Sequence, residues 1–124
     1  SSTVSIDLAA AFAFRMTGRQ RILAYRHGYH GHTGFAGAIT GSLDEGIIAH
    51  YNLPRGLAVF FEPYGDLAAV RAALDDGVAA LILEPMDYET FAPASAEFLL
   101  GARTACREAG ALFIIDETRT GLGR

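Results

Sequence analysis

Short apolar runs recur along the chain and alternate with segments that have helical spacing. Three of these runs, Leu57–Phe61, Val78–Leu83 and Ala111–Ile115, predict buried strands because each is continuous and rich in large apolar residues. Arg21–Tyr25 predicts a shorter strand, and Phe35–Thr40 a weaker extended run. Strands that alternate with helices are typical of βαβ units, so the pattern predicts an α/β fold in three layers, with a mostly parallel sheet and helices on both faces.

Helical spacing predicts three helices between these strands, at Val4–Thr17, from Asp66 to Leu74 and from Ser95 to Ala109. The second and third helices start at residue types that cap helix N-termini. The first helix is apolar nearly all round, so we expect it to lie deep inside a larger body. Residues 41–56 and 84–94 show neither the helical nor the strand repeat of apolar residues, so they are expected to be irregular.

Size and charge limit the classes of partner. The 124 residues are 51% hydrophobic, which is typical of one globular domain or a piece of one, and residues 1–124 show no internal boundary. A formal net charge of −4 leaves no basic stripe for nucleic acid or a membrane surface. No apolar run is long enough to cross a bilayer.

Two residue types carry further information. The single cysteine, Cys106, falls within a helical pattern, has no internal disulfide partner and is expected in the core, which suits a reducing cytoplasm. The chain contains no lysine, so these residues alone supply no side-chain amine for Schiff-base chemistry. The chain also starts without methionine in what looks like a loop, which is expected of a fragment.

Polar side chains follow the predicted strands at one edge of the sheet, where open α/β sheets bind ligands. Tyr29 and His30 follow the strand that ends at Tyr25, while Glu84 and Asp116 directly follow two later strands. The residues before the first helix are Ser-Ser-Thr, and the unpaired amides of a helix N-terminus hold phosphate well. This edge therefore combines an anion cradle, an aromatic face and a carboxylate.

Those three features suit a flat, phosphorylated heterocycle with a protonated ring nitrogen. Pyridoxal 5'-phosphate is such a molecule: the cradle takes its phosphate, Tyr29 stacks on its ring, and a carboxylate keeps its pyridine nitrogen protonated. Asp116 is the candidate for that carboxylate because it ends a strongly apolar strand, where an unpaired charge is costly.

The sequence resembles the class III pyridoxal-phosphate-dependent aminotransferases of fold type I. The stretches "MTGRQRILAYRHGYHGHT", "LILEP" and "GALFIIDETRTGLGR" carry the resemblance, in the order and approximate spacing of that family. "YHGH", residues 29–32, is closer to the glutamate-1-semialdehyde aminomutase-like branch than to branches with arginine after the glycine. The resemblance implies that residues 1–124 are a central, partial piece of the large, cofactor-binding domain.

This resemblance implies roles for particular residues. Tyr29 would stack on the cofactor, Asp116 would bind its pyridine nitrogen, and Ser2 and Thr3 would hold its phosphate. Thr118 stands where the family usually has valine or isoleucine, and its methyl would pack on the second face of the ring. The remaining candidates near the cofactor are His30 and Glu84.

The resemblance also implies an activity: the complete protein would move an amino group between an amine or amino acid and a carbonyl compound. The family places its Schiff-base lysine shortly downstream of the "DETRTGLGR" motif, so this chain alone is predicted to be inactive. Family members place the active site at a homodimer interface, so a homodimer is expected. A non-catalytic relative is the alternative.

Other interpretations of the same residues stay open. His27, His30 and His32 are candidates for a metal site in an unrelated doubly wound domain, although a glycine-rich loop fixes no common face for them. Tyr29 fits a plain core aromatic. His30 fits a hydrogen-bonded, partly buried histidine, and Glu84 fits a simple strand end.

Arginine is the residue type to consider for ion pairs and substrate carboxylates. Asp116 has a structural alternative as a buried ion pair with Arg119 or Arg124. No arginine is singled out by its position as a substrate ligand.

Overall fold

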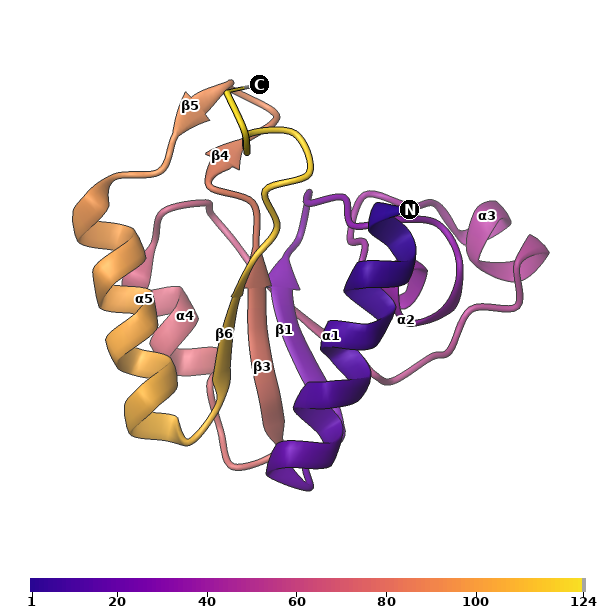
Figure 1. Cartoon of the computed structure of the whole chain (residues 1–124), viewed down its shortest axis with the longest axis horizontal. Helices are drawn as coiled ribbons and strands as arrows, with labels where there is room; N and C mark the ends of the chain where they lie inside the picture. The colour runs from indigo at the N-terminus through magenta and orange to yellow at the C-terminus, as the bar shows by residue number, and fades with distance from the viewer. Residues whose placement is uncertain (124) are drawn as a thin grey trace.

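The computed structural model describes residues 1–123, and its centre is a parallel sheet of four strands (Figure 1). The strands lie in the order β2-β1-β3-β6, with β2 at Ala58–Phe61, β1 at Arg21–Tyr25, β3 at Val78–Leu83 and β6 at Leu112–Ile115. The buried apolar runs thus form the strands that their composition predicts. Every residue of β3 is buried, as expected for a central strand covered on both faces.

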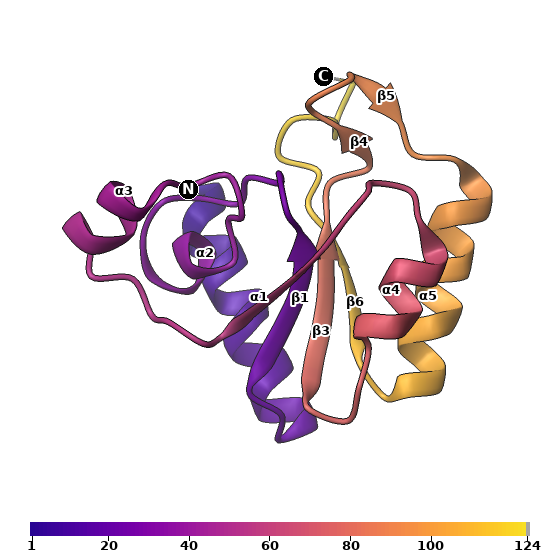
Figure 2. The same ribbon diagram turned by 180° about the vertical axis from the view of Figure 1, so that it is seen from behind.

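Helices cover both faces of the sheet (Figures 1 and 2). Helices α1 (Ser2–Thr17) and α2 (Gly34–Ala38) lie on one face, and α4 (Leu67–Ala73) and α5 (Ala96–Ala109) lie on the other. The predicted three-layer α/β arrangement is therefore confirmed. Cys106 is on the buried side of α5, where burial raises the pKa of its thiol to about 11.

Sequence signals at the helix ends act as predicted. The carboxylate of Asp66 accepts a hydrogen bond from the Ala69 amide at 3.1 Å, and the hydroxyl of Ser95 accepts one from the Phe98 amide at 3.0 Å. Gly110 ends α5 in the left-handed region, with φ 75°, which favours glycine. These caps fix where the α4 and α5 layer begins and ends.

The predicted extended run at Phe35–Thr40 is wrong, because residues 34–38 form the short helix α2. Its formation depends on tertiary contacts: the Asp7 carboxylate of α1 accepts a hydrogen bond from the Ala36 amide at 2.7 Å. The ring of Phe35 also packs edge-on against Phe14 of α1, with 5.5 Å between ring centroids. Both contacts join residues far apart in the sequence, so local spacing cannot show them.

Two other segments are more regular than predicted. Residues 41–56 contain helix α3 (Glu45–His50), whose N-terminus is capped by Asp44. Residues 84–94 contain the strands β4 (Met86–Asp87) and β5 (Ala92–Pro93), which pair in an antiparallel hairpin. This hairpin rises above the C-terminal edge of the parallel sheet in both ribbon views (Figures 1 and 2).

Helix α1 is only partly covered by residues 1–123, so the expectation that it lies deep inside a larger body stays a prediction. Its buried residues are Ile6, Ala10 and Ala13. The opposite side leaves an apolar stripe exposed, formed by Val4, Leu8, Phe12 and Met16. Within residues 1–123, no helix is both long and apolar enough to span a membrane.

Candidate active site

The candidate site lies where the connections from two neighbouring strands lead to opposite edges of the sheet. From the end of β1 the chain passes through α2 on one face, whereas from the end of the neighbouring β3 it passes to α5 on the other face (Figure 1). Because the two connections lead away from each other, a crevice for a ligand is expected near the carboxyl ends of β1 and β3, the usual ligand position in an open α/β sheet.

Backbone contacts hold the loop after β1 over this crevice. The His30 amide donates to the Thr40 hydroxyl at 2.8 Å, and that hydroxyl lies 2.7 Å from the carbonyl oxygen of Gly31. The Ser42 amide donates to the carbonyl of Gly28 at 3.3 Å. The segment around residue 40 thus fixes the loop that carries the tyrosine and histidine of the predicted site.

Gly41 permits this close approach, and its replacement by alanine gives the first prediction. A Cβ at position 41 would lie 2.2 Å from the carbonyl oxygen of Arg26, a backbone atom with little freedom to move. We expect Gly41→Ala to lower the free energy of unfolding by about 1–3 kcal/mol, measured by chemical denaturation. Gly46→Ala is the matched control, because Gly46 is exposed on α3 and the atom nearest to an added Cβ belongs to the side chain of Asp44. Equal stability of the two variants would contradict the prediction.

The predicted residues converge on one pocket of about 80 Å³. It lies between the N-terminus of α1, the loop after β1 and the loop after β6. The residues that line it are Ser2, Thr3, Tyr29, His30, Gly31, Asp116, Thr118 and Arg119. Six of the seven predicted site residues thus share one pocket, and the seventh, Glu84, lies directly behind it, bonded to two of the lining residues.

Larger hollows exist elsewhere on the molecule but lack this chemistry. One of about 240 Å³ lies between α3 and β2, and one of about 590 Å³ lies at the opposite edge of the sheet. Their arginines are engaged with protein groups: Arg55 with Glu45, Arg21 with Asp75, Arg19 with backbone carbonyls, and Arg26 with the ring of Phe60. We therefore identify the candidate site by the residues that line it, not by its volume, and place it at the carboxyl ends of the strands.

Asp116 is a buried carboxylate with a full set of donors. Its Oδ2 lies 2.8 Å from Nδ1 of His30, and its Oδ1 accepts from the amide and the hydroxyl of Thr118 at 3.0 and 2.6 Å. Burial raises the pKa of the carboxyl, but the hydrogen bonds from His30 and Thr118 outweigh burial and hold the pKa below its ordinary value. Asp116 therefore presents a negative charge to the pocket.

His30 is the main partner of this charge. Its side chain is completely buried, so a role as a partly buried histidine is wrong, and its Nε2 has no hydrogen-bond partner among the described residues. The alternative of an ion pair between Asp116 and Arg119 is also wrong, because Arg119 pairs with Glu84. Arg124, the other predicted partner, lies outside the described residues.

Tyr29 offers an accessible aromatic face rather than a core contact. The residue is 40% exposed, which rules out the plain core interpretation. Its amide donates to Oε2 of Glu84 at 3.2 Å, and its hydroxyl lies 3.3 Å from Nδ1 of His32. The backbone and the ring hydroxyl of Tyr29 are thus both held while the residue lines the pocket.

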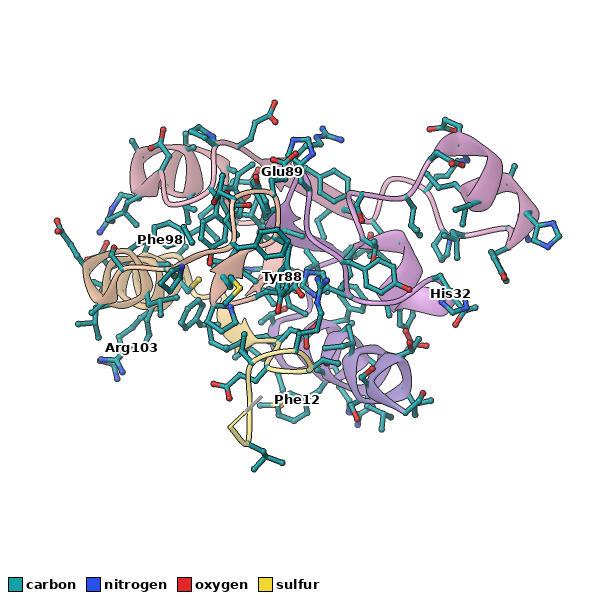
Figure 3. All side chains as sticks on the ribbon, turned by 90° about the horizontal axis from the view of Figure 1, so that it is seen from above. Phe12, His32, Tyr88, Glu89, Phe98 and Arg103 are labelled. Carbon is teal, nitrogen blue, oxygen red and sulfur yellow. The ribbon has the colours of Figure 1, made fainter. Side chains whose placement is uncertain are left out.

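Glu84 does more than end a strand, and its main partner is Arg119, which the sequence analysis considered only as a partner of Asp116. Buried Glu84 accepts hydrogen bonds from Nε and Nη2 of Arg119 through one oxygen, Oε1. The Arg119 guanidinium also stacks on Tyr88 of the hairpin, with 3.4 Å between Cζ and the ring centroid. Figure 3 looks down on this edge of the sheet and shows Tyr88 near its middle.

The N-terminus of α1 supplies the remaining wall of the pocket. The helix begins at Ser2, so the amides of its first turn have no partner within the helix. Thr3 packs against the loop after β1, because a Cβ at Gly31 would lie 2.9 Å from the Thr3 hydroxyl oxygen. Amides and hydroxyls are suitable donors for a phosphate at this place.

The histidines of the loop have separate partners. Nε2 of His27 lies 3.3 Å from Glu62, whereas His32 contacts Tyr29 and packs edge-on against Tyr51. Among residues 1–123, no group of three or more His, Cys, Asp or Glu side chains is placed to hold a metal ion. The histidine loop thus supports no metal site within that part of the chain.

The fold is that of a doubly wound α/β protein, and the pocket lies at the carboxyl ends of its strands, where such proteins usually bind ligands. The family model for aminotransferase class-III matches residues 1–124, and the chain belongs to that family. The hypothesis of an unrelated doubly wound domain is therefore wrong.

Curated relatives agree with this assignment. The chain is 46% identical over 120 residues to the acetylornithine aminotransferase of Corynebacterium efficiens, a match that covers 93% of this chain and 29% of the relative. It is 39% identical over 130 residues to the [LysW]-aminoadipate semialdehyde transaminase of Deinococcus radiodurans, covering 100% of this chain and 29% of the relative. The chain thus spans less than a third of the length of these relatives.

A solved structure has the same fold. The FumI protein of Sphingopyxis sp. MTA144, described as a PLP internal aldimine form, matches with a TM-score of 0.80 and 29% identity. The match covers 98% of this chain and 29% of that chain. The expected fold type, a parallel α/β domain like those of pyridoxal-phosphate aminotransferases, is therefore confirmed.

Proposed function

We propose that this chain is part of a pyridoxal-phosphate-dependent aminotransferase that moves an amino group between an amine or amino acid and a carbonyl compound. Membership of the class-III family supports the proposal. The single observation that carries it is the pocket in which Asp116, Tyr29 and Thr3 meet, since a carboxylate, an accessible aromatic ring and a helix N-terminus are the three groups that this cofactor requires.

Each residue then has a defined task toward the cofactor. Pyridoxal phosphate, when bound, supplies an electron sink for the carbon that bears the amino group. Asp116 holds the proton on the ring nitrogen by its negative charge, and Tyr29 stacks on the ring. Ser2 and Thr3 hold the phosphate, and Thr118 orients the Asp116 carboxylate through its hydroxyl and amide.

Two residues act behind those that touch the cofactor. His30 fixes one oxygen of Asp116 and keeps the carboxylate ionised, because its hydrogen bond favours the charged form. Glu84 positions the backbone of Tyr29 by accepting its amide hydrogen bond. Both residues are buried, so they act out of contact with bulk water.

The finer assignments belong to this proposal as well. The "YHGH" stretch, residues 29–32, supports the glutamate-1-semialdehyde aminomutase-like branch, although the relatives described above are named for other transaminases. The family resemblance supports a homodimer of the complete protein. The unpaired, buried Cys106 supports a reducing cytoplasm.

Borohydride trapping tests the proposed function. The complete protein, loaded with pyridoxal phosphate and reduced, should carry the cofactor on a lysine that peptide mapping places outside residues 1–124. The 124-residue chain treated in the same way should show no lysine adduct, because it contains no lysine. An adduct on this chain would mean that the chemistry has been assigned to the wrong type of residue.

The same cofactor-loaded protein can be used to distinguish the enzyme hypothesis from the hypothesis of a non-catalytic relative. Incubation of the complete protein with an amino donor should leave the amino group on the cofactor, detected by mass spectrometry before any carbonyl acceptor is added. Cofactor bound without amination by any donor in a panel of amino acids and amines would support the non-catalytic alternative and contradict the proposal.

A further inference from the structure

The hollow of about 240 Å³ between α3 and β2 has no part in the proposed function. We propose that it is a second ligand site, which binds a small carboxylate with an apolar body and thereby stabilises the loop that carries Tyr29 and His30. The inference goes beyond amino transfer, because this pocket shares no lining residue with the candidate active site.

Arg26 supplies a cation that is available to a ligand in this pocket. Its guanidinium lies over the ring of Phe60, with 4.6 Å between Cζ and the ring centroid. Stacking engages the flat face of the group and holds its orientation, but leaves the N–H donors at its edge free. Among residues 1–123, no acceptor forms a hydrogen bond or ion pair with the side chain of Arg26, which is exposed.

The other charged residues of the lining neutralise each other. Nη1 of Arg55 lies 3.2 Å from Oε2 of Glu45. Arg26 is thus the remaining charge among the lining residues that the structure describes, and it has no opposite partner there. An anion therefore gains most at Arg26, whereas Glu45 disfavours a second binding position beside Arg55.

Apolar side chains form much of the remaining surface. The large apolar residues of the lining are Leu43, Ile48, Leu53 and Phe60, all buried or partly buried. The volume is below the roughly 300–1,000 Å³ of pockets for drug-sized ligands, which favours a ligand of only a few carbon atoms. The planar edge of a guanidinium matches a carboxylate through paired hydrogen bonds. These properties together indicate a short aliphatic acid.

The pocket is connected to the loop of the candidate active site. Thr40 and Gly41 belong to its lining, and the Thr40 hydroxyl accepts the hydrogen bond from the His30 amide at 2.8 Å. Gly41 packs directly on the backbone of Arg26, where that loop leaves β1. A ligand that binds only while these residues are ordered shifts the loop toward its ordered state. Occupancy of the pocket should therefore be felt at Tyr29.

Matched ligands test the site by calorimetric titration of the complete protein without cofactor. The probes are 4-methylpentanoate, its neutral counterpart 4-methylpentanamide, and acetate, which lacks the apolar body. We expect 4-methylpentanoate to bind at least about 10-fold more tightly than the amide, because the amide forms no charged pair with arginine. It should also bind at least about 10-fold more tightly than acetate, which buries less apolar surface.

Substitutions assign this binding to the pocket. Arg26→Gln should raise the dissociation constant of 4-methylpentanoate at least about 10-fold and remove its advantage over the amide. Arg26→Lys keeps the charge without the planar edge, so it should recover only part of the loss. Arg71→Gln is the control, because Arg71 pairs with Glu108 on α4 and α5, and it should leave all values unchanged.

Hydrogen exchange tests the effect on the loop. At 4-methylpentanoate concentrations well above the dissociation constant, amide exchange in residues 28–32 should slow at least about threefold. The same concentration should have no effect on this segment in Arg26→Gln.

Several results would overturn the inference. The absence of 4-methylpentanoate binding, or equal affinity for the acid and the amide, would exclude a carboxylate site. Binding that Arg26→Gln leaves intact would place the ligand elsewhere, including the cofactor pocket. Unchanged exchange in residues 28–32 would exclude the effect on the loop. None of these measurements uses cofactor or turnover, so their failure is distinguishable from a failure of the proposed function.

Discussion

Replacement of Asp116 by asparagine in the complete, cofactor-loaded protein is expected to slow amino transfer by about 10²-fold to 10³-fold. Asparagine keeps the shape of the side chain but removes the negative charge that stabilises a proton on the cofactor's ring nitrogen. Without that proton the cofactor is a poorer electron sink, so the chemical step slows. Single-turnover measurements with a saturating amino donor would report this step directly.

The charge of Asp116 also predicts a pH dependence. The hydrogen bonds from His30 and Thr118 hold its pKa below the ordinary 3.8 in spite of burial, so the carboxylate stays ionised at every pH above that value. The wild-type rate should therefore show no loss from protonation of Asp116 between neutral pH and about pH 5.

Asp75→Asn is the matched control for this substitution. Asp75 pairs with Arg21 at the opposite edge of the sheet and is half exposed, so its neutralisation leaves the pocket untouched. The control should keep the wild-type rate. If Asp116→Asn were as fast as Asp75→Asn with the cofactor still bound, the carboxylate would have no role in the chemistry.

The sequence predicted the sheet and one edge of it well, for a physical reason. A fully buried parallel strand has to be continuously apolar, as Val78–Leu83 is, and the carboxyl ends of parallel strands lie at a common edge. Residues that directly follow such strands are therefore brought together whatever the details of packing. Glu84 and Asp116 are placed in this way, and so is the loop that carries Tyr29.

The elements that were missed depend on contacts that local spacing does not encode. Helix α2 starts where a carboxylate of α1 reaches its amide, 29 positions away in the sequence. The hairpin strands β4 and β5 have two residues each, too few for a period-two pattern. Helix α3 was predictable in part, since Asp44 is a good N-cap residue, but its few residues include a glycine that weakens the helical signal.

The sequence also did not predict which side chains pair with each other within the site. The structural alternative considered for Asp116 was an ion pair with an arginine, yet its side-chain partner is His30, which is 86 positions away, and Arg119 pairs with Glu84. Each pairing depends on strand register and on side-chain rotamers, which the apolar pattern does not encode. The apolar sequence pattern fixes the edge of the sheet but not the partners along it.

The partnership of His30 and Asp116 gives the prediction with the largest expected effect on stability. In His30→Leu, Asp116 keeps its contacts with Thr118 but loses its buried partner, and we expect the free energy of unfolding at pH 7 to fall by about 3–5 kcal/mol. Leucine fills much of the same volume, so a cavity is not the main cause. Chemical denaturation of the apo-protein measures the loss.

A double-mutant cycle separates the lost pairing from lost packing. His30→Leu combined with Asp116→Leu should be destabilised less than the sum of the two single variants, because the double variant buries no unpaired charge. Additive losses would show that His30 contributes through packing alone.

The same variants should respond to pH in a defined direction. In the wild type, the folded-state pKa of Asp116 is lowered, so the ionised carboxylate stabilises the fold above the ordinary pKa and that stabilisation is lost as pH falls through the lowered value. Without His30 the pKa of the buried carboxyl rises, and ionisation then opposes folding at neutral pH. The stability difference between wild type and His30→Leu should therefore be largest near pH 7 and narrow below about pH 4. A difference that stays constant over this range would mean that the histidine does not act through the charge of Asp116, and the role proposed for it at the cofactor would fail with it.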